Sequence, residues 1–292
     1  MPDRDEPWTI LRLLNWTQSY LRDKGSESPR LDAEVLLSHV LQTDRVKLYT
    51  QYAQEVGSTD RASYRELIRK RAEGSPVAYL VGRKEFFSLP LSVSPGVLIP
   101  RPDTEFAVVE CLDVLKGRAE PLVVDVGTGS GAIALAVAHQ RIDARLVAID
   151  LSPDALAVAR SNAERHRLSD RVEFVEGDLL APVADRGPFD VIISNPPYIP
   201  TGVIPTLDAG VREFEPHLAL DGGEDGLRVV SRLIEQAAPL LKPGGHLILE
   251  IGSDQEQPVR DLLGSFPELE PAPTVRDGAG HPRVIRARRR DG

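Results

Sequence analysis

The chain has 292 residues, of which 41% are hydrophobic and 27% charged, and its formal net charge is −9. This length predicts one large α/β domain with a smaller appended unit, and the balanced composition excludes a chain that is disordered throughout. The negative charge argues against sequence-independent attraction to phosphate backbones, so we expect no stable nucleic acid partner.

Cysteine and histidine usage limits the redox and metal chemistry that we expect. Cys111 is the single cysteine, so it forms no internal disulfide, and core packing is its expected role. No pair of histidines has the short spacing of a metal-binding motif, and we expect no metal site. Neither a secretory signal nor a run of about 18 apolar residues occurs. We therefore expect a cytosolic protein without a membrane segment. A monomer is the expected oligomeric state.

Residues 1–82 have the pattern of a small helical domain. Ser28 followed by Pro29 favours a helix start. Apolar and amphipathic residues recur at helical spacing in three groups, which are Ile10, Leu11, Leu14 and Leu21, then Leu31, Val35, Leu36 and Val40, then Tyr64, Leu67, Ile68 and Arg71. We expect this domain to dock the substrate.

Residues 83–102 predict a β-hairpin that links two domains. Two apolar runs, residues 86–93 and 97–99, lie on either side of Pro95-Gly96, a dipeptide typical of turns.

Residues 103–292 alternate apolar runs with helical segments. The strand candidates are Leu122–Val126, Leu146–Ile149, Val172–Val175, Val191–Ser194 and His246–Ile251. This alternation predicts a Rossmann-like α/β domain, a parallel sheet with helices on both faces. Residues 269–275 and 283–288 are joined by a loop, which predicts an antiparallel hairpin at the sheet edge.

A glycine turn follows the first strand of this domain. Gly127, Thr128, Gly129, Ser130 and Gly131 come directly after Val126 and before a helical segment. Glycines let a ligand approach the backbone closely, and the helix N-terminus offers free amide hydrogens. Asp150 ends the second strand about 20 residues further on, where a carboxylate can accept hydrogen bonds from both ribose hydroxyls. The sequence therefore predicts an adenosine cofactor.

The identity of that cofactor stays open on these residues. Gly127, Gly129 and Ala132 also fit a dinucleotide fingerprint, so an NAD-dependent oxidoreductase is an alternative. Asp178 follows the third strand, where its carboxylate can recognise an adenine amino group, although Asp is also common in exposed turns. A non-catalytic binding module is a further alternative.

The fourth strand runs directly into Asn195-Pro196-Pro197-Tyr198. Two prolines fix φ and end the strand in a rigid corner. The Asn195 side-chain oxygen and the Pro196 carbonyl can each accept one N–H of an –NH2 group, and Tyr198 can pack against a planar group. This chemistry predicts a methyl acceptor site that works by positioning, and it suits an adenine and an amide equally.

The Asn195 segment resembles the amino-methyltransferases with an Asn/Asp-Pro-Pro-Tyr/Phe signature, which include adenine N(6) DNA methyltransferases and protein-glutamine methyltransferases. Residues 76–91, 98–105 and 215–227 are similar to the peptide chain release factor N(5)-glutamine methyltransferases, the HemK family. The likeness covers nearly the whole chain.

The resemblance implies a seven-stranded class I methyltransferase fold that uses S-adenosyl-L-methionine and releases S-adenosyl-L-homocysteine. It implies methylation of the glutamine in the Gly-Gly-Gln loop of bacterial class I release factors. Gly127 to Gly131 and Asp150 would bind the cofactor, and Asn195 to Tyr198 the glutamine amide. Leu179 replaces a larger aromatic residue that some relatives place beside the adenine. An adenine N(6) methyltransferase and a ribosomal-protein glutamine methyltransferase stay open as alternatives.

Arg101 and four arginines near the end of the chain lie outside these motifs. Arg101 lies between Pro100 and Pro102, where it either contacts substrate or forms an ion pair with Glu105 or Glu215. The arginines at 286, 288, 289 and 290 are expected in a solvated terminus.

Overall fold

The computed structural model describes residues 7–291. The chain folds into two compact units, Met1–Gly82 with Ala209–Phe214, and Arg83–Asp208 with Glu215–Gly292. The hairpin expected between two domains thus belongs to the second unit. Residues 209–214 belong to the first unit, which the sequence pattern does not indicate. In residues 7–291 no helix is long and apolar enough to cross a bilayer.

The first unit is built from short helices. They are α1 (Ile10–Asp23), α2 (Pro29–Val40), α3 (Arg45–Thr50), α4 (Ser58–Ala72), α5 (Val77–Val81) and α9 (Ala209–Arg212). The expected stripes were wrong at Leu11 and Leu31, which are exposed, whereas Leu13 and Leu37 are buried. The buried face of α1 is formed by Ile10, Leu13, Leu14, Thr17 and Leu21, and Leu11 lies outside this face.

A β-hairpin opens the second unit, but its turn differs from the expected one. Strands β1 (Arg83–Phe86) and β2 (Leu89–Ser92) are antiparallel. The turn lies at Phe87 and Ser88, with φ of 48° and 63°, and not at Pro95-Gly96. Positive φ at both positions matches the twist of the strands. Residues without the usual Asn-Gly signal occupy this turn, which is why the sequence pattern misplaced it.

The main sheet has the strand order β10-β12-β9-β6-β3-β4-β5, with β11 paired to β12. The strands are β3 (Leu122–Val126), β4 (Arg145–Asp150), β5 (Val172–Glu176), β6 (Phe189–Ser194), β9 (Leu241–Glu250), β10 (Leu269–Pro271), β11 (Val275–Arg276) and β12 (Pro282–Arg289). The neighbouring strands β5, β4, β3, β6 and β9 are parallel. Strand β12 is antiparallel to β9, β10 and β11. The expected α/β architecture is confirmed, but the sheet within residues 7–291 has eight strands where the resemblance implied seven. The expected antiparallel pairing at the sheet edge is also confirmed, because β12 pairs with β10 and β11 and β10 is the edge strand.

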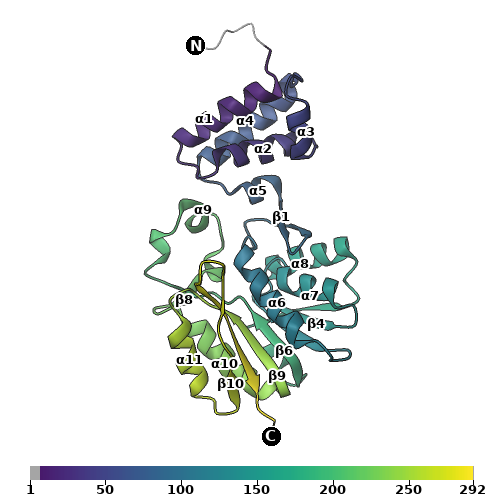
Figure 1. Ribbon diagram of the computed structural model, residues 1–292, viewed down its shortest axis with the longest axis vertical. Coiled ribbons are helices and arrows are strands. Elements are labelled where there is room, and N and C mark those ends of the chain that lie inside the picture. The colour runs from purple at the N-terminus through teal and green to yellow at the C-terminus, as the bar shows by residue number, and fades with distance from the viewer. Residues whose placement is uncertain (1–6, 292) are drawn as a thin grey trace. The chain divides into compact units, whose positions relative to one another are not determined.

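Helices cover both faces of this sheet (Figure 1). On one face lie α6 (Glu105–Val114), α7 (Ala132–Gln140) and α8 (Pro153–His166), and on the other lie α10 (Arg228–Leu240) and α11 (Glu256–Gly264). Neighbouring residues of β3 enter different cores, because Val123 packs with the α6 side and Val124 with the α10 side. Cys111 is buried in the first of these cores, as expected.

Shorter elements occur in the loops of the second unit. They are the 3-10 helices η1 (Pro102–Thr104), η2 (Ala181–Val183), η3 (Ile204–Thr206) and η4 (His217–Ala219), and the parallel strands β7 (Ile199–Pro200) and β8 (Asp221–Gly223).

The arginine-rich end of the chain is not a solvated tail. Strand β12 continues to Arg289, and Arg286 lies 3.1 Å from Glu110 on α6. The expectation of a solvated terminus was wrong for Arg286, Arg288 and Arg289, because the pairing of β12 with β9 and β10 extends through these residues.

Candidate functional site

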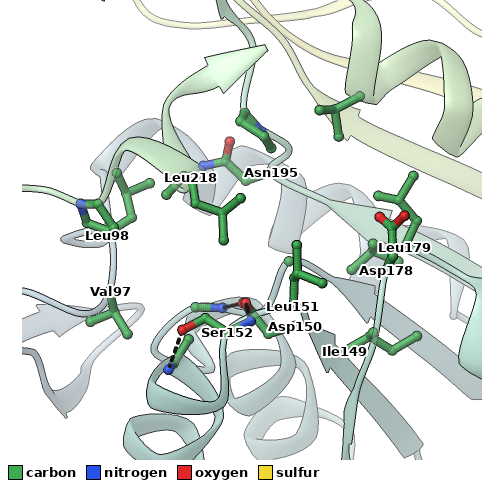
Figure 2. Close-up of a pocket in the computed structure, with 18 of the residues that line it drawn as sticks. Val97, Leu98, Ile149, Asp150, Leu151, Ser152, Asp178, Leu179, Asn195 and Leu218 are labelled. Atoms are coloured by element: carbon green, nitrogen blue, oxygen red, sulfur yellow. Dashed lines mark hydrogen bonds between the residues drawn. The ribbon is translucent and has the colours of Figure 1, made fainter. Parts of the chain in front are cut away.

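A cavity of about 360 Å³ opens at the carboxyl ends of β3, β4, β5 and β6 (Figure 2). This volume lies within the usual range of small-molecule sites, and the position is where open parallel sheets bind ligands. Among its lining residues are Gly127, Gly129, Asp150, Asp178, Leu179 and Asn195. The structure thus brings together residues from distant parts of the chain. The hydrogen bond from the Ser194 hydroxyl to the Val126 carbonyl, 68 positions apart, illustrates this.

The glycine turn forms one wall of the cavity. Gly127 and Gly129 have φ of 71° and 56°, and a Cβ at either position would have no atom within 4 Å. A side chain there would project into open space, so the bare main chain is what faces a ligand. Thr128, Ser130 and Gly131 do not line the cavity, although sequence analysis grouped them with the cofactor site.

The buried residues of this turn hold its shape from behind. Thr128 donates to Asp125 across 2.6 Å, and the Ala134 amide at the start of α7 donates to the same carboxyl oxygen across 3.1 Å. Asp125 is fully buried, and burial raises its pKa to about 7. Sequence analysis missed Asp125, because a carboxyl group inside an otherwise apolar strand was counted only as part of that strand.

Asp150 ends β4 beside the glycine turn. Its carboxylate accepts hydrogen bonds from the Gly129 amide at 2.8 Å and from the Ser152 amide at 2.9 Å. These two donors orient the carboxylate and leave lone pairs on both oxygens for further donors. Burial raises the pKa of Asp150. In Figure 2, Asp150 and Ser152 lie across the cavity from Asn195.

Asp178 and Leu179 lie on the side of the cavity that Ile149 also lines (Figure 2). Asp178 is exposed and lies 2.5 Å from Arg232 on α10, so that arginine holds the carboxylate at the rim. Leu151 also lines the cavity and is 50% exposed, a position that sequence analysis did not single out. Two leucine side chains, Leu151 and Leu179, therefore offer apolar contact to a planar ring.

Asn195 leaves β6 at the cavity, and its Nδ2 donates to Thr104 Oγ1 across 3.1 Å. Pro197 also lines the cavity, whereas Pro196 and Tyr198 lie outside its lining. The Tyr198 carbonyl accepts a hydrogen bond from Gln255 Nε2 at 2.9 Å. The segment is thus held at both ends by side chains from other parts of the fold.

A buried carboxyl group lies behind this segment. The Tyr198 hydroxyl donates to Glu250 Oε1 across 3.4 Å, and burial raises the pKa of both groups, that of Glu250 to about 7. Glu250 Oε2 is buried without a hydrogen-bond partner among residues 7–291. Such an atom costs about 1–3 kcal/mol, so Glu250 is not explained by stability.

Arg101 pairs with Glu215 and not with Glu105. Its Nη2 lies 2.5 Å from Glu215 Oε1, and the Ile99 amide donates to the other carboxyl oxygen across 3.4 Å. Glu105 instead accepts a hydrogen bond from the Phe87 amide at 3.0 Å. The position of Arg101 therefore fits the ion-pair alternative, and the pair joins the two loops that contribute Leu98 and Leu218 to the cavity.

Two of the residues that sequence analysis missed share one signal. Asp125 and Glu250 are acidic residues in or at the end of apolar strands, and Thr104 and Gln255 are polar residues that the fold buries. A charged residue at the carboxyl end of an interior strand could have been found, because parallel strand ends converge at one edge. Thr104 and Gln255 carry no such signal, since their contacts come from distant parts of the chain.

Family comparisons cover both units of the chain. Residues 12–82 match the PrmC N-terminal domain, and residues 106–206 match the methyltransferase small domain. The second match contains the glycine turn, Asp150, Asp178 and Asn195.

Relatives align over nearly the full length. The chain is 43% identical over 288 residues to the release factor glutamine methyltransferase of Rhodopirellula baltica, with 96% of each chain covered. It is 46% identical over 284 residues to the release factor glutamine methyltransferase of Moorella thermoacetica, covering 97% of this chain and 99% of that one. A methyltransferase structure from Pyrococcus furiosus aligns with a TM-score of 0.50 and 22% identity, covering 70% of this chain and 91% of that one. This last likeness concerns the fold alone.

Proposed function

The chain belongs to the release factor glutamine methyltransferase family, and from this premise we propose that it methylates the side-chain amide nitrogen of the glutamine in the Gly-Gly-Gln motif of bacterial class I release factors. The methyl donor is S-adenosyl-L-methionine, and the product is S-adenosyl-L-homocysteine. The observation that carries the proposal is that Asn195 lines the same cavity as Gly127, Gly129 and Asp150. An acceptor amide at Asn195 and a nucleoside at Asp150 would share one enclosed space.

The cavity residues fit the proposed cofactor by their donor and acceptor chemistry. Asp150 would accept hydrogen bonds from the ribose hydroxyls through lone pairs that Gly129 and Ser152 leave free. Asp178 would accept from the adenine amino group, and Leu179 and Leu151 would pack against the ring. The main chain at Gly127 and Gly129 would face the amino-acid part, because no side chain intervenes.

The remaining residues of the predicted turn would act without touching the cofactor. Thr128 fixes Asp125, Ser130 accepts a hydrogen bond from Asn162 at 2.9 Å through its carbonyl, and Gly131 caps α7 in a left-handed conformation. These contacts keep the turn in one shape, which lowers the entropy cost of binding.

The acceptor site would work by positioning. An amide nitrogen is a weak nucleophile because its lone pair is delocalised into the carbonyl group. The Asn195 Oδ1 and the Pro196 carbonyl would each accept one of its N–H groups, which directs the nitrogen and stabilises the positive charge that develops on it. Pro197, which lines the cavity, would hold the corner rigid, and Tyr198, which lies outside the lining, would anchor the segment through its hydrogen bonds to Glu250 and Gln255.

When bound, S-adenosyl-L-methionine supplies an electrophilic methyl group on a sulfonium. The side chain of Asn195 and the carbonyl of Pro196 would hold the acceptor amide nitrogen towards that group, and the nitrogen would release one proton to water as it takes the methyl. No strong general base is required, because the proton becomes acidic as the nitrogen gains positive charge.

The helical unit would dock the release factor. It presents exposed apolar side chains, among them Trp16, Val46 and Tyr49, which form usable contact surface for a protein. Arg101 would support the substrate side of the cavity through Glu215. We expect the enzyme to act as a monomer in the cytoplasm.

Labelled S-adenosyl-L-methionine tests the proposal directly. Incubation with a release factor should label the wild-type partner, and the partner with Ala in place of the motif glutamine should stay unlabelled. Mass spectrometry should then locate the methyl group on that glutamine. Equal labelling of both partners contradicts the proposal, and methylation of an adenine-containing duplex with release factors inactive would favour a nucleic acid substrate.

A further inference from the structure

Gln255 is a buried glutamine in the loop between β9 and α11. It is the N-cap residue of α11 and is 6% exposed. Its side chain is not among those that line the cavity. It contacts main-chain atoms of the loops that surround the acceptor segment.

Three hydrogen bonds hold the Gln255 side chain. Its Oε1 accepts from the Gly252 amide at 2.9 Å, and its Nε2 donates to the Tyr198 carbonyl at 2.9 Å and to the Gly226 carbonyl at 3.4 Å. Tyr198 follows β6, Gly226 follows β8 and Gly252 follows β9. The loops after three strands therefore meet at one side chain.

The partners of Gln255 permit only one orientation of its amide group. A main-chain amide only donates a hydrogen bond, and a carbonyl oxygen only accepts one. Oε1 must therefore face Gly252, and Nε2 must face Tyr198 and Gly226. Glutamate has the same shape but offers two acceptors, and methionine has a similar length but no amide group. A mismatch would be costly here, because a buried polar atom has no water to replace a lost partner.

The hydrogen bond to Tyr198 fixes one end of the acceptor segment. At the other end, Asn195 Nδ2 donates to Thr104 Oγ1 across 3.1 Å. Two prolines with fixed φ lie between these ends, so the main chain has little freedom to turn and the Pro196 carbonyl keeps one direction. Gly226 also lies against this segment, because a Cβ at Gly226 would collide with the Tyr198 carbonyl oxygen.

We propose that Gln255 is a positioning residue of the acceptor site, which fixes the direction of the Pro196 carbonyl by holding the Tyr198 carbonyl with its amide hydrogen. This inference rests on the proposed function, in which the Pro196 carbonyl accepts one N–H of the glutamine amide. The contact with Gly226 also ties the segment to residues 221–228, whose two end residues line the cavity. Gln255 acts on the reacting nitrogen through the main chain, without touching it.

Gln255→Met tests whether the amide group is needed. It removes the donor and the acceptor while keeping an unbranched side chain of similar length. We expect kcat to fall by about 10- to 100-fold, because a small displacement at the reacting nitrogen lowers the rate steeply. Affinity for S-adenosyl-L-homocysteine, measured by calorimetry, should stay within about threefold of wild type, because Gly127, Gly129 and Asp150 lie on other loops. Retained affinity also shows that the variant is folded.

Gln255→Glu supplies a reading that a packing role would not change. The new carboxyl group would be buried against two carbonyl oxygens, which raises its pKa, and it can donate to the Tyr198 carbonyl only while it is protonated. The rate of this variant relative to wild type should therefore rise as the pH is lowered from about 9 to about 6. At the acidic end it should exceed the rate of Gln255→Met, whose rate relative to wild type should stay constant.

Gln257→Glu is the matched control. It makes the same chemical change two residues further along α11, where the Gln257 side chain is exposed and donates to Asp261 at 2.7 Å. Its rate should stay at the wild-type level across the same pH range.

The outcomes separate this inference from the proposed function. With an active wild type, an unaffected Gln255→Met overturns the inference alone, as does a Gln255→Glu variant that stays slow at acidic pH. Affinity for S-adenosyl-L-homocysteine that falls in proportion to the rate also overturns it, because Gln255 would then support the whole cavity. Gln255→Glu is compared with itself across pH, so the test holds even if Gln255→Met does not fold. A wild type that methylates no release factor overturns the proposed function and this inference with it.

Discussion

Arg101 and Glu215 form an ion pair with 2.5 Å between Nη2 and Oε1, and the pair joins two loops that lie far apart in the chain. Glu215 is 4% exposed, whereas the Arg101 side chain is 36% exposed. The loops on either side of the pair contribute Leu98 and Leu218 to the cavity. The pair therefore links the shape of the cavity wall to the stability of the second unit.

Removal of the Arg101 side chain should lower the free energy of unfolding more than neutralisation of Glu215. Arg101→Ala leaves a buried carboxylate without its cation and should lower the free energy of unfolding by about 1–3 kcal/mol, less than for a fully buried pair because Arg101 is partly solvated. Glu215→Gln leaves only a partly exposed arginine and should cost less. Both should weaken binding of S-adenosyl-L-homocysteine several-fold in calorimetry.

A double-mutant cycle measures the coupling within this pair. Arg101→Ala with Glu215→Gln should show an interaction energy of about 0.5–3 kcal/mol in urea unfolding. The exposed pair Arg69–Glu73 on α4, with 2.6 Å between nitrogen and oxygen, is the matched control and should give below about 1 kcal/mol. Equal interaction energies in the two cycles would mean that the burial of Glu215 does not strengthen its ion pair with Arg101.

Asn195→Ala should separate rate from cofactor affinity. Loss of one hydrogen-bond acceptor at the reacting nitrogen should lower kcat by about 10²- to 10³-fold, whereas affinity for S-adenosyl-L-homocysteine should change little. Asp150→Asn should do the reverse, with affinity reduced about tenfold or more through weaker ribose hydrogen bonds. Steady-state kinetics and calorimetry on both variants test this, and an unchanged rate in Asn195→Ala refutes the acceptor role.

The strands that end at the cavity could be predicted because their signal is local. The predicted strand Leu122–Val126 is apolar except for Asp125, and β3 has the predicted bounds. The hairpin turn at Phe87-Ser88 could not be found, because positive φ at these residues comes from the pairing of β1 and β2 and not from turn-forming residue types. The placement of residues 209–214 in the helical unit likewise depends on tertiary contacts.

In the candidate site too, residues with a local sequence signal could be predicted, and residues that depend on tertiary contacts could not. Gly127, Asp150 and Asn195 were singled out because each follows or ends a strand, and the fold brings them to one cavity. Thr104 and Glu250 were missed, since their importance lies in hydrogen bonds to residues about 50 to 90 positions away in sequence. The residue type alone did not decide whether Arg101 contacts substrate or Glu215, because an arginine suits both roles.

Gly226→Ala should disturb the acceptor segment through steric contact. A Cβ at Gly226 would collide with the Tyr198 carbonyl oxygen and lie 2.6 Å from Gln255 Nε2, at a φ of 77°. We expect a loss of about 2–4 kcal/mol, from backbone strain and overpacking together, and a lower kcat. Gly25→Ala is the matched control, because Gly25 has a φ of 84° but open space around it. Gly25→Ala should lower the free energy of unfolding only by the backbone strain. If both variants lose the same free energy in urea unfolding, the close approach of Gly226 to Tyr198 does not contribute.

The titration of Asp125 should appear in the pH dependence of stability. Burial raises its pKa to about 7 in the folded protein, whereas an aspartate in an unfolded chain titrates near about 4. Between these values the folded protein holds a proton that the unfolded chain has released. Stability therefore falls as pH rises from about 4 to about 7, and stays level above that.

Asp125→Asn removes this titration while keeping an acceptor for Thr128 and Ala134. The stability of wild type relative to the variant should decrease by up to about 4 kcal/mol across this window, at about 1.36 kcal/mol per pKa unit. Glu250 is present in both proteins, so its own titration cancels. Urea unfolding of the two proteins between about pH 4 and pH 8 measures the difference. A constant difference across this range would mean that folding does not raise the pKa of Asp125, because the Thr128 hydroxyl and the Ala134 amide then stabilise its charge enough to offset burial.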